Sequence, residues 1–251
     1  MAILDPSALL FLIVPLLGAF VVGRSAKSTA GTIASVVLPM GVVGTIISLV
    51  IMLQSLDDPS AVGSAMAAAL LPALYAGLIK LGLDVYGPEG TTEREQPPLG
   101  LSAAGVALWL VAIIAFFMLD ADDMTALIQP EAMAATLLSV IGIVVLTKAS
   151  GSDERVDRLA RYLPYAGLLI FFAGVVGILD SMNDPAALGP YMALSLLGLL
   201  YATTLSVCLK LARPDLVATE PPTPQWLFWG ASIAGISFSF GMVLVSISAV
   251  S

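Results

Sequence analysis

The side chains that could do chemistry are few in this sequence, and most of them are acidic. The 251 residues include no histidine and a single cysteine, Cys208, which lies in an apolar stretch. One cysteine excludes an intrachain disulfide and argues against a metal–thiolate cluster. We find no Ser–His–Asp set, no metal-ligand spacing and no phosphate-binding loop. The sequence therefore predicts neither an enzyme nor a bound cofactor or metal.

Two acidic loops share an Asp-Pro pair. Asp58-Pro59, preceded by Asp57, is matched by Asp184-Pro185 in the second half. Aspartate is a favoured N-cap, and proline fits the first helical turn because the N–H that it lacks would be unpaired there. Both pairs therefore predict the start of a helix.

The elements that position these residues must lie in a lipid bilayer. Hydrophobic residues make up 59% of the chain and charged residues only 11%, whereas soluble domains have about 25% charged residues. Several apolar runs reach the roughly 20 residues that cross a bilayer as a helix. The formal net charge of −8 argues against nucleic acid as a partner. We expect an all-α polytopic membrane protein.

Eight membrane spans can be placed by hydropathy. The first follows Asp5 and has no basic segment before it, so we interpret it as a retained span rather than a signal peptide. The spans are residues 7–23, 31–53, 62–83, 100–119, 131–147, 163–179, 187–209 and 226–249.

The positive charges predict the orientation. With eight spans, all ten Lys and Arg residues fall at or beside the loops after spans one, three, five and seven. The charged residues of the loops on the opposite face are all acidic. Basic loops stay cytoplasmic, so we expect both termini to lie outside.

The spans form two tandem copies of a four-helix unit. Residues 55–76 and 181–202 are identical at 12 of 22 positions with a constant offset of 126. The predicted units are residues 1–125 and 126–251. Because each unit has an even number of spans, both copies should cross the membrane in the same direction, as parallel repeats.

A longer pattern surrounds the first acidic loop. Residues 44–79 read GTIISLVIMLQSLDDPSAVGSAMAAALLPALYAGLI. This segment closely resembles the third and fourth membrane helices of the MotA/TolQ/ExbB proton-channel family, above all flagellar stator subunits of the MotA type. Matching positions include Gly44, Thr45, Asp57, Asp58, Pro59, Gly63, Met66 and Tyr75. In the second copy they are Asp184, Pro185, Gly189, Met192 and Tyr201. The chain looks like a duplicated, loop-truncated MotA-type subunit.

The resemblance implies an ion path shared with a partner. In that family, subunits surround a partner whose single membrane helix carries a proton-accepting Asp, and Thr and small residues line the path. Thr45 and Ser48 lie three residues apart, hence on one helix face, and both can offer hydroxyls to such a carboxylate. We expect a subunit of a proton- or sodium-driven channel or motor in the bacterial inner membrane, within an oligomeric complex.

The sequence departs from the family where it matters for function. The family's Thr-Thr pair is Pro72-Ala73 in the first copy, and Phe171 stands in place of Thr45 in the second. No titratable residue lies near the centre of a predicted span. Two alternatives stay open: a non-conducting structural or accessory subunit of an envelope or motor complex, and a small-solute transporter. Parallel repeats disfavour the transporter folds that rest on inverted repeats.

Two smaller expectations concern the surface. Trp109, Trp226 and Trp229 are interpreted as anchors at the membrane interface or as lipid-facing bulk. Residues 151–161 are interpreted as a short amphipathic segment on the cytoplasmic side.

Overall fold

The computed structural model describes residues 5–54, 62–86, 96–120, 124–149, 155–181 and 185–215. All regular elements in these ranges are helical, which confirms the predicted all-α class. They are α1 (Pro6–Ser25), α2 (Thr29–Gln54), α3 (Val62–Ala69), α4 (Leu71–Tyr86), α5 (Leu99–Asp120), η1 (Met124–Leu127), α6 (Pro130–Ala149), α7 (Arg155–Asp180) and α8 (Pro185–Ala212). Seven of these stretches are long and apolar enough to cross a membrane, with α3 and α4 counted as one. The predicted eighth span, 226–249, lies outside the described residues.

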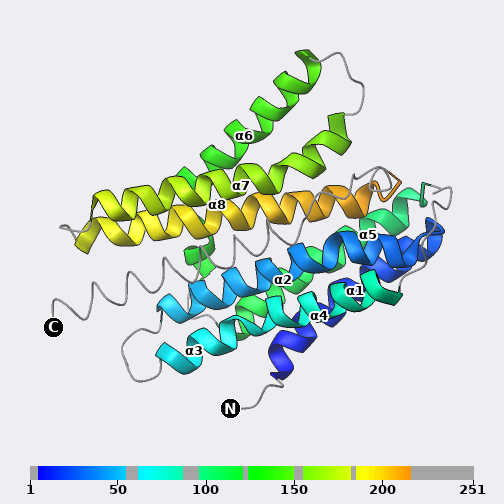
Figure 1. Cartoon of the computed structure of the whole chain (residues 1–251), viewed down its shortest axis with the longest axis horizontal. Helices are drawn as coiled ribbons and strands as arrows, with labels where there is room; N and C mark the ends of the chain where they lie inside the picture. Colours follow the sequence, from blue (N-terminus) through cyan, green and yellow to red (C-terminus); the bar gives the residue numbers. More distant parts are fainter. Residues whose placement is uncertain are drawn as a thin grey trace.

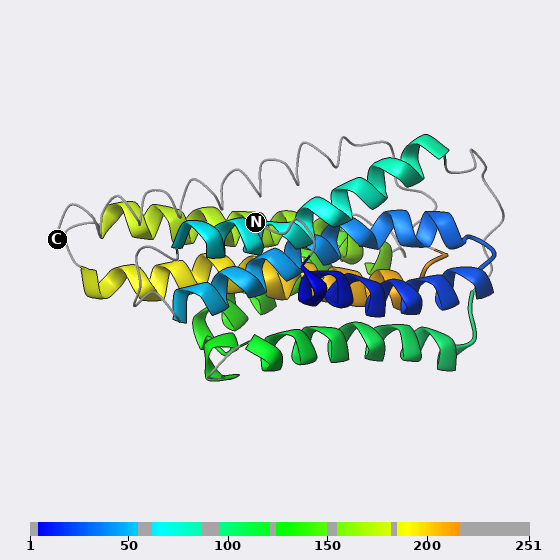
Figure 2. The same ribbon diagram turned by 90° about the horizontal axis from the view of Figure 1, so that it is seen from below.

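Four helices lie side by side in the order α4, α2, α8, α7 (Figure 1). The helix α2 is the most enclosed of the spans and contacts α1, α4 and α8. On one side of this row, α5 packs on α1 and α8 (Figure 2). The helix α6 lies at the edge of the bundle, against α7 and α8. The row therefore joins the first half of the chain to the second through α2 and α8.

The first hairpin follows directly from local sequence. The carboxylate of Asp5 caps α1 by accepting a 2.9 Å hydrogen bond from the Ser7 amide, and Pro6 occupies the first turn. The helix ends at Ser25. Lys27 then adopts φ of 56°, a left-handed conformation rare outside glycine, and the chain reverses into α2. Sequence reasoning placed these two helices correctly to within two residues.

The predicted span 62–83 is not one straight helix, and this corrects the expectation. Its helix breaks at Leu70 into α3 and α4. The cause is Pro72, which has no N–H to donate to Ala68 and whose ring crowds that carbonyl. The equivalent residue of α8 is Gly198, and α8 continues unbroken through that position.

Residues 155–161, part of the predicted amphipathic segment, are helical and form the first turns of α7, whereas residues 151–154 lie outside the described residues. One further expectation is wrong. Trp109 is not an interface anchor: its side chain is fully buried in the described structure, with its ring centre 5.8 Å from that of Phe11. Trp226 and Trp229 lie outside the described residues.

The two halves share contacts at equivalent positions. The amide of Asp5 donates to the Tyr75 hydroxyl at 3.2 Å, and the amide of Gln129 donates to the Tyr201 hydroxyl at the same distance. A Cβ atom at Gly41 would lie 2.3 Å from that of Ala76, and one at Gly167 would lie 2.7 Å from that of Ala202, so neither position has room for a side chain. Each pair is separated from its counterpart by 124 or 126 residues. These two contacts thus occur at equivalent positions in both halves, and the division of the chain into two tandem units stays a prediction.

One contact is found in both equivalent helix pairs, α2–α4 and α7–α8, but its large and its small residue lie on opposite helices in the two pairs. In the first half, Gly44 on α2 packs against Pro72 on α4. In the second half, Ile170 on α7 packs against Gly198 on α8. The small residue has moved from one helix to the other, so that the helices of both pairs can approach closely.

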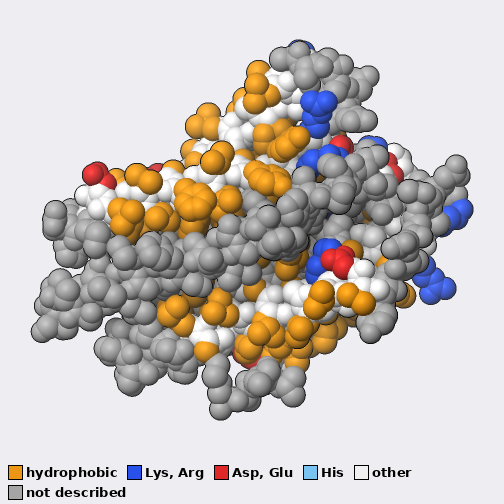
Figure 3. Space-filling view, in the orientation of Figure 1, with side chains coloured by type: hydrophobic (Ala, Val, Ile, Leu, Met, Phe, Trp, Pro, Cys, Tyr) orange, Lys and Arg blue, Asp and Glu red, His pale blue; other side chains and the backbone are white. Residues whose placement is uncertain are grey.

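The described charges are segregated along the helices. In Figure 3, Lys and Arg side chains gather toward the right, where α1 ends and α2 begins in Figure 1. Described apolar side chains cover the parts of the visible face over α6, α7 and α4. This distribution agrees with basic loops on one side of a bilayer, although the direction of insertion stays a prediction.

Candidate functional site

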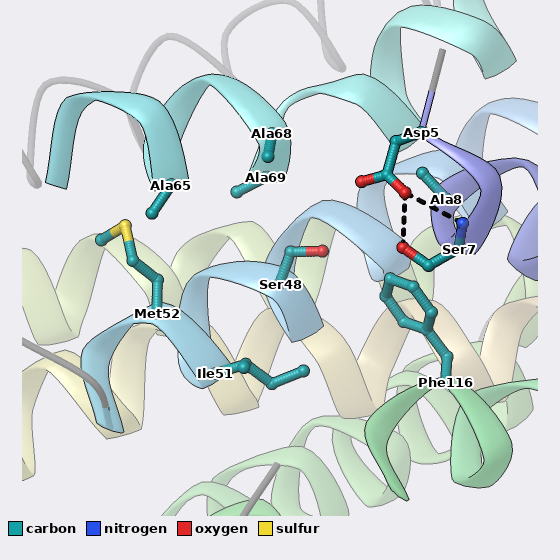
Figure 4. A pocket seen from close by; sticks show the side chains of 10 residues that line it. All are labelled: Asp5, Ser7, Ala8, Ser48, Ile51, Met52, Ala65, Ala68, Ala69 and Phe116. Carbon is teal, nitrogen blue, oxygen red and sulfur yellow. Dashed lines mark hydrogen bonds between the residues drawn. The ribbon is translucent and has the colours of Figure 1, made fainter. Parts of the chain in front are cut away.

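A cavity of about 200 Å³ opens beside α3, within the first half of the chain. Four segments contribute to its wall: the start of α1, the last turns of α2, α3 and the end of α5 (Figure 4). Its lining residues are Asp5, Ser7, Ala8, Ser48, Ile51, Met52, Ala65, Ala68, Ala69 and Phe116. The α3 side of the cavity is lined by alanines, whose small side chains do not fill the space between α3 and the other helices.

The polar groups of the cavity come from α1 and α2. The Asp5 carboxylate accepts hydrogen bonds from the amide and hydroxyl of Ser7, at 2.9 and 2.6 Å. The Ser7 hydroxyl is the main reason that the pKa of Asp5 lies below its ordinary value. Asp5 is therefore ionised at neutral pH. A carboxylate beside hydroxyl groups can attract a cation or a hydrated proton.

Ser48 lies across the cavity from Asp5 on α2. Its hydroxyl donates to the Gly44 carbonyl one turn earlier, at 3.0 Å, a common arrangement for a hydroxyl in a membrane helix. Its oxygen keeps lone pairs for a further donor or a cation.

Thr45 lies one turn away on the same side of α2 but outside the cavity. It is almost completely buried, and its hydroxyl accepts a 3.3 Å hydrogen bond from the Ala73 amide. In a straight helix that amide would bond to Ala69, but it lies beside the break caused by Pro72. Thr45 thus compensates for the kink in the opposite helix. Its predicted place in an ion path stays a prediction.

Some of the other residues predicted from the family pattern lie in the part of the chain that the structure describes, and some do not. Tyr75 is buried and joins α4 to the start of α1, whereas Met66 on α3 is half-buried. Met192 is buried in α8, and the Tyr201 hydroxyl joins α8 to the Leu127 carbonyl and the Gln129 amide. Asp57, Asp58, Pro59 and Asp184 lie outside the described residues. Gly63, Pro185 and Gly189 lie in the first turns of α3 and α8. The predicted capping by Asp58 and Asp184 is thus untested.

Sequence reasoning missed the contribution of α1 to this site. Asp5 and Ser7 were visible as a polar pair before an apolar run, but nothing in their spacing showed that α1 begins beside the end of α2. The tyrosine of the repeated Leu-Tyr-Ala pattern was the available signal. Tyr75 carries the long-range hydrogen bond that fixes the start of α1.

Together, the apolar helices and the segregated charges define a multi-pass helical membrane protein. Two curated bacterial proteins match short stretches of it. One is "Chemotaxis protein PomA" of Vibrio alginolyticus, 52% identical over 40 residues, which are 16% of this chain and 16% of that protein. The other is "Motility protein A" of Cereibacter sphaeroides, 55% identical over 70 residues, which are 25% of this chain and 28% of that protein.

These matches support a MotA-like family, and they cover only part of each protein. The aligned part spans between a sixth and about a quarter of each relative's length. No protein-family profile matches the chain, and no solved structure resembles it significantly. Both relatives are named for chemotaxis or motility rather than for an enzymatic reaction. The spans and these relatives place the chain in the bacterial inner membrane.

Proposed function

We propose that this chain is a wall subunit of an ion-driven channel or motor. It acts with a membrane partner whose single span carries an acidic residue. The observation that carries the proposal is the identity above 50% with PomA and Motility protein A over short stretches. The ion, a proton or sodium, passes beside α2 and α3 of the first half.

The cavity supports this assignment. It presents one ionised carboxylate and two hydroxyls at the end of α1, α2 and α3 that lies away from the basic loops. A cation arriving from that side meets Asp5 first and then Ser48, whose helix leads inward to Thr45. The second half has Phe171 and Gly174 at the positions of Thr45 and Ser48, so it serves as wall and packing surface.

The test is ion flux, or the driven activity, in cells that contain the chain and its partner. Thr45→Val removes the hydroxyl and keeps the shape, so flux should fall at least tenfold. Thr45→Ser is the matched control, because it keeps the hydroxyl and should retain most of the flux. Membrane abundance of each variant is measured in parallel, since Thr45 also supports α4. Full flux in a stably inserted Thr45→Val protein contradicts the proposal.

A non-conducting structural subunit is the second candidate, and the Thr45 contact favours it. A hydroxyl that compensates for the kink at Pro72 has a sufficient structural reason to be present. In that case the chain conducts no ions, and Thr45→Val lowers its abundance and thermal stability while the activity of its complex per inserted molecule is unchanged. The small-solute transporter receives no such support, because the described cavity lies within the first half rather than between the halves.

A further inference from the structure

The cavity beside α3 has a counterpart in the second half of the chain. The helices α2 and α3, which supply much of its wall, correspond to α7 and the first turns of α8 at an offset of 126. We call this counterpart the second-half site. It is formed by Gly174 and Gly177 on α7 and by Tyr191, Leu194 and Ser195 on α8. The residues that correspond to the α5 wall lie outside the described residues, so the two sites are compared on the sides of the other helices.

Every alanine that α3 contributes to the cavity has a larger counterpart on α8. Ala65, Ala68 and Ala69 line the cavity from α3, across from α2 (Figure 4). Their counterparts at an offset of 126 are Tyr191, Leu194 and Ser195. Space beside α3 in the first half therefore corresponds to side-chain atoms of α8 in the second.

The side chains of α8 lie directly on α7. A Cβ atom at Gly177 would lie 2.3 Å from Cδ1 and 2.6 Å from Cε1 of the Tyr191 ring. A Cβ atom at Gly174 would lie 2.6 Å from that of Ser195. The first-half counterparts of the two glycines line the cavity with larger side chains, and they are Ser48 and Ile51. The small residues of α7 thus let α8 approach closely, where α2 and α3 leave the cavity between them.

The continuous course of α8 assists this contact. The helix α3 is separated from α4 by the break at Pro72, whereas α8 continues through Gly198. Near the middle of α8, Ala202 packs on Gly167 of α7. Because α8 is not broken, its contact with α7 continues from there to Tyr191.

The polar group at the start of α6 differs as well. The counterpart of Asp5, at an offset of 124, is Gln129, whose amide is neutral. Its Nε2 donates a 3.1 Å hydrogen bond to the carbonyl of Pro190, the residue directly before the tyrosine. Glu131, the counterpart of Ser7, is exposed. Gln129 therefore ties α6 to α8 and presents no negative charge to a cation.

We propose that Tyr191 closes the second-half site, so that the chain presents a cation with one cavity and not two. The tyrosine ring occupies the space beside Gly177, and without the ring that space would open between α7 and α8. Uptake of a cation by the open cavity rests on the proposed function. The closure of its counterpart rests only on the contacts between α7 and α8.

Thiol labelling tests the closure without reference to ion flux. In a Cys208→Ala background, Ala68→Cys places a thiol in the cavity and Leu194→Cys places one in the second-half site. A methanethiosulfonate reagent reacts with the thiolate, which forms where water reaches the sulfur. In opened membranes, Ala68→Cys should be labelled at least tenfold faster than Leu194→Cys. Because cysteine is smaller than leucine, the second change itself favours access, and equal rates would overturn the closed state.

Removal of the ring identifies the side chain responsible. Tyr191→Ala should raise the labelling rate of Leu194→Cys at least tenfold. Tyr165→Ala is the matched control, because Tyr165 is 38% exposed against 36% for Tyr191 and lies about three turns from Gly177 along α7. It should leave the rate unchanged. Slow labelling in a stably inserted Tyr191→Ala protein would overturn the role of the ring, in favour of closure by the helix contact at Gly174.

The reverse exchange tests the same contact in the first half. Ile51→Gly together with Ala65→Tyr gives α2 and α3 the pair found on α7 and α8. It should lower the labelling rate of Ala68→Cys at least tenfold, whereas Ile51→Gly alone should not. Undiminished labelling in a stably inserted double variant would overturn the closure by a tyrosine.

Ion flux in the same double variant separates this inference from the proposed function. If the cavity lies on the ion path, flux with the partner present should fall together with the labelling. Flux that persists after labelling is lost would contradict the proposed function, while the lost labelling would still support closure by the tyrosine. Membrane abundance of every variant is measured in parallel.

Discussion

At the scale of single residues, the polar side chains of this protein serve mainly to satisfy backbone groups. The Thr45 hydroxyl accepts a hydrogen bond from the Ala73 amide, which has no helical partner because of the kink at Pro72. The Tyr75 hydroxyl accepts a hydrogen bond from the Asp5 amide at the start of α1. An unpaired amide in an apolar environment costs about 1–3 kcal/mol. Each of these hydroxyls is therefore a stability determinant whether or not ions pass nearby.

The two tyrosines allow the equivalence of the halves to be measured. Tyr75→Phe and Tyr201→Phe each remove one hydroxyl that accepts a backbone amide at 3.2 Å. Tyr75→Phe should lower the free energy of unfolding by about 1 kcal/mol, and Tyr201→Phe by more, because the Tyr201 hydroxyl also donates to the Leu127 carbonyl; thermal unfolding in detergent measures both. The two losses should add in the double variant, because the sites are far apart and share no partner. A loss at only one site would argue that the hydrogen bonds have different roles.

The lowered pKa of Asp5 predicts a dependence of stability on pH. A carboxyl whose folded pKa is depressed adds stability that is fully present above its ordinary pKa of 3.8. That stability disappears as the pH falls through the lowered folded value. Asp5→Ala should therefore lower the melting temperature at pH 7 clearly more than at pH 3. Asp5→Asn, which can still cap α1, serves as the control and should be milder at pH 7. An Asp5→Ala effect that is equal at both pH values would contradict this account.

At the scale of helices, the break between α3 and α4 couples two elements. Pro72 removes one helical hydrogen bond, and the next amide turns to Thr45 on α2. Pro72→Ala should restore a continuous helix in which Ala73 can bond to Ala69.

A double-mutant cycle tests this coupling. Thr45→Val should be costly in the wild-type background and nearly neutral in the Pro72→Ala background, with a coupling energy of about 1 kcal/mol or more. Melting temperatures of the four proteins give the measurement. Independent, additive effects would mean that Thr45 acts through something other than the kink.

Helix positions could be predicted from the sequence, whereas their environment could not. The length of the apolar runs placed α1 and α2 within two residues. Pro72 was the available signal for the break between α3 and α4, which were predicted as one continuous span. The burial of Trp109 had no such signal, because lipid and protein interiors are equally apolar and hydropathy does not distinguish them. The cavity was unpredictable for the same reason: it depends on how α1, α2, α3 and α5 converge. Repeat analysis predicted which helices are equivalent, but not which of their faces stay exposed.

At the scale of the whole molecule, the charge distribution predicts the orientation in the membrane. Cysteines replacing Ser60 or Asp122, in a Cys208→Ala background, should react from outside the cell with a membrane-impermeant thiol reagent. Cysteines replacing Ser28 or Ser152 should react only after the membrane is opened, which also serves as the control for reactivity. Labelling of all four from one side would contradict both the number of spans and the direction of insertion.

The exchange of large and small residues across equivalent helix pairs has a consequence for how the chain folds. During synthesis, α2 is made before its partner α4, and α7 before its partner α8. All four helices are then present in one bilayer, and α2 resembles α7 as α4 resembles α8. If α7 paired with α4 through this contact, Ile170 would meet Pro72, and the helices could not close. If α2 paired with α8 in the same way, Gly44 would meet Gly198 and leave an unfilled gap. The contact thus sorts helices that otherwise resemble each other, so that each finds its neighbour in its own half of the chain.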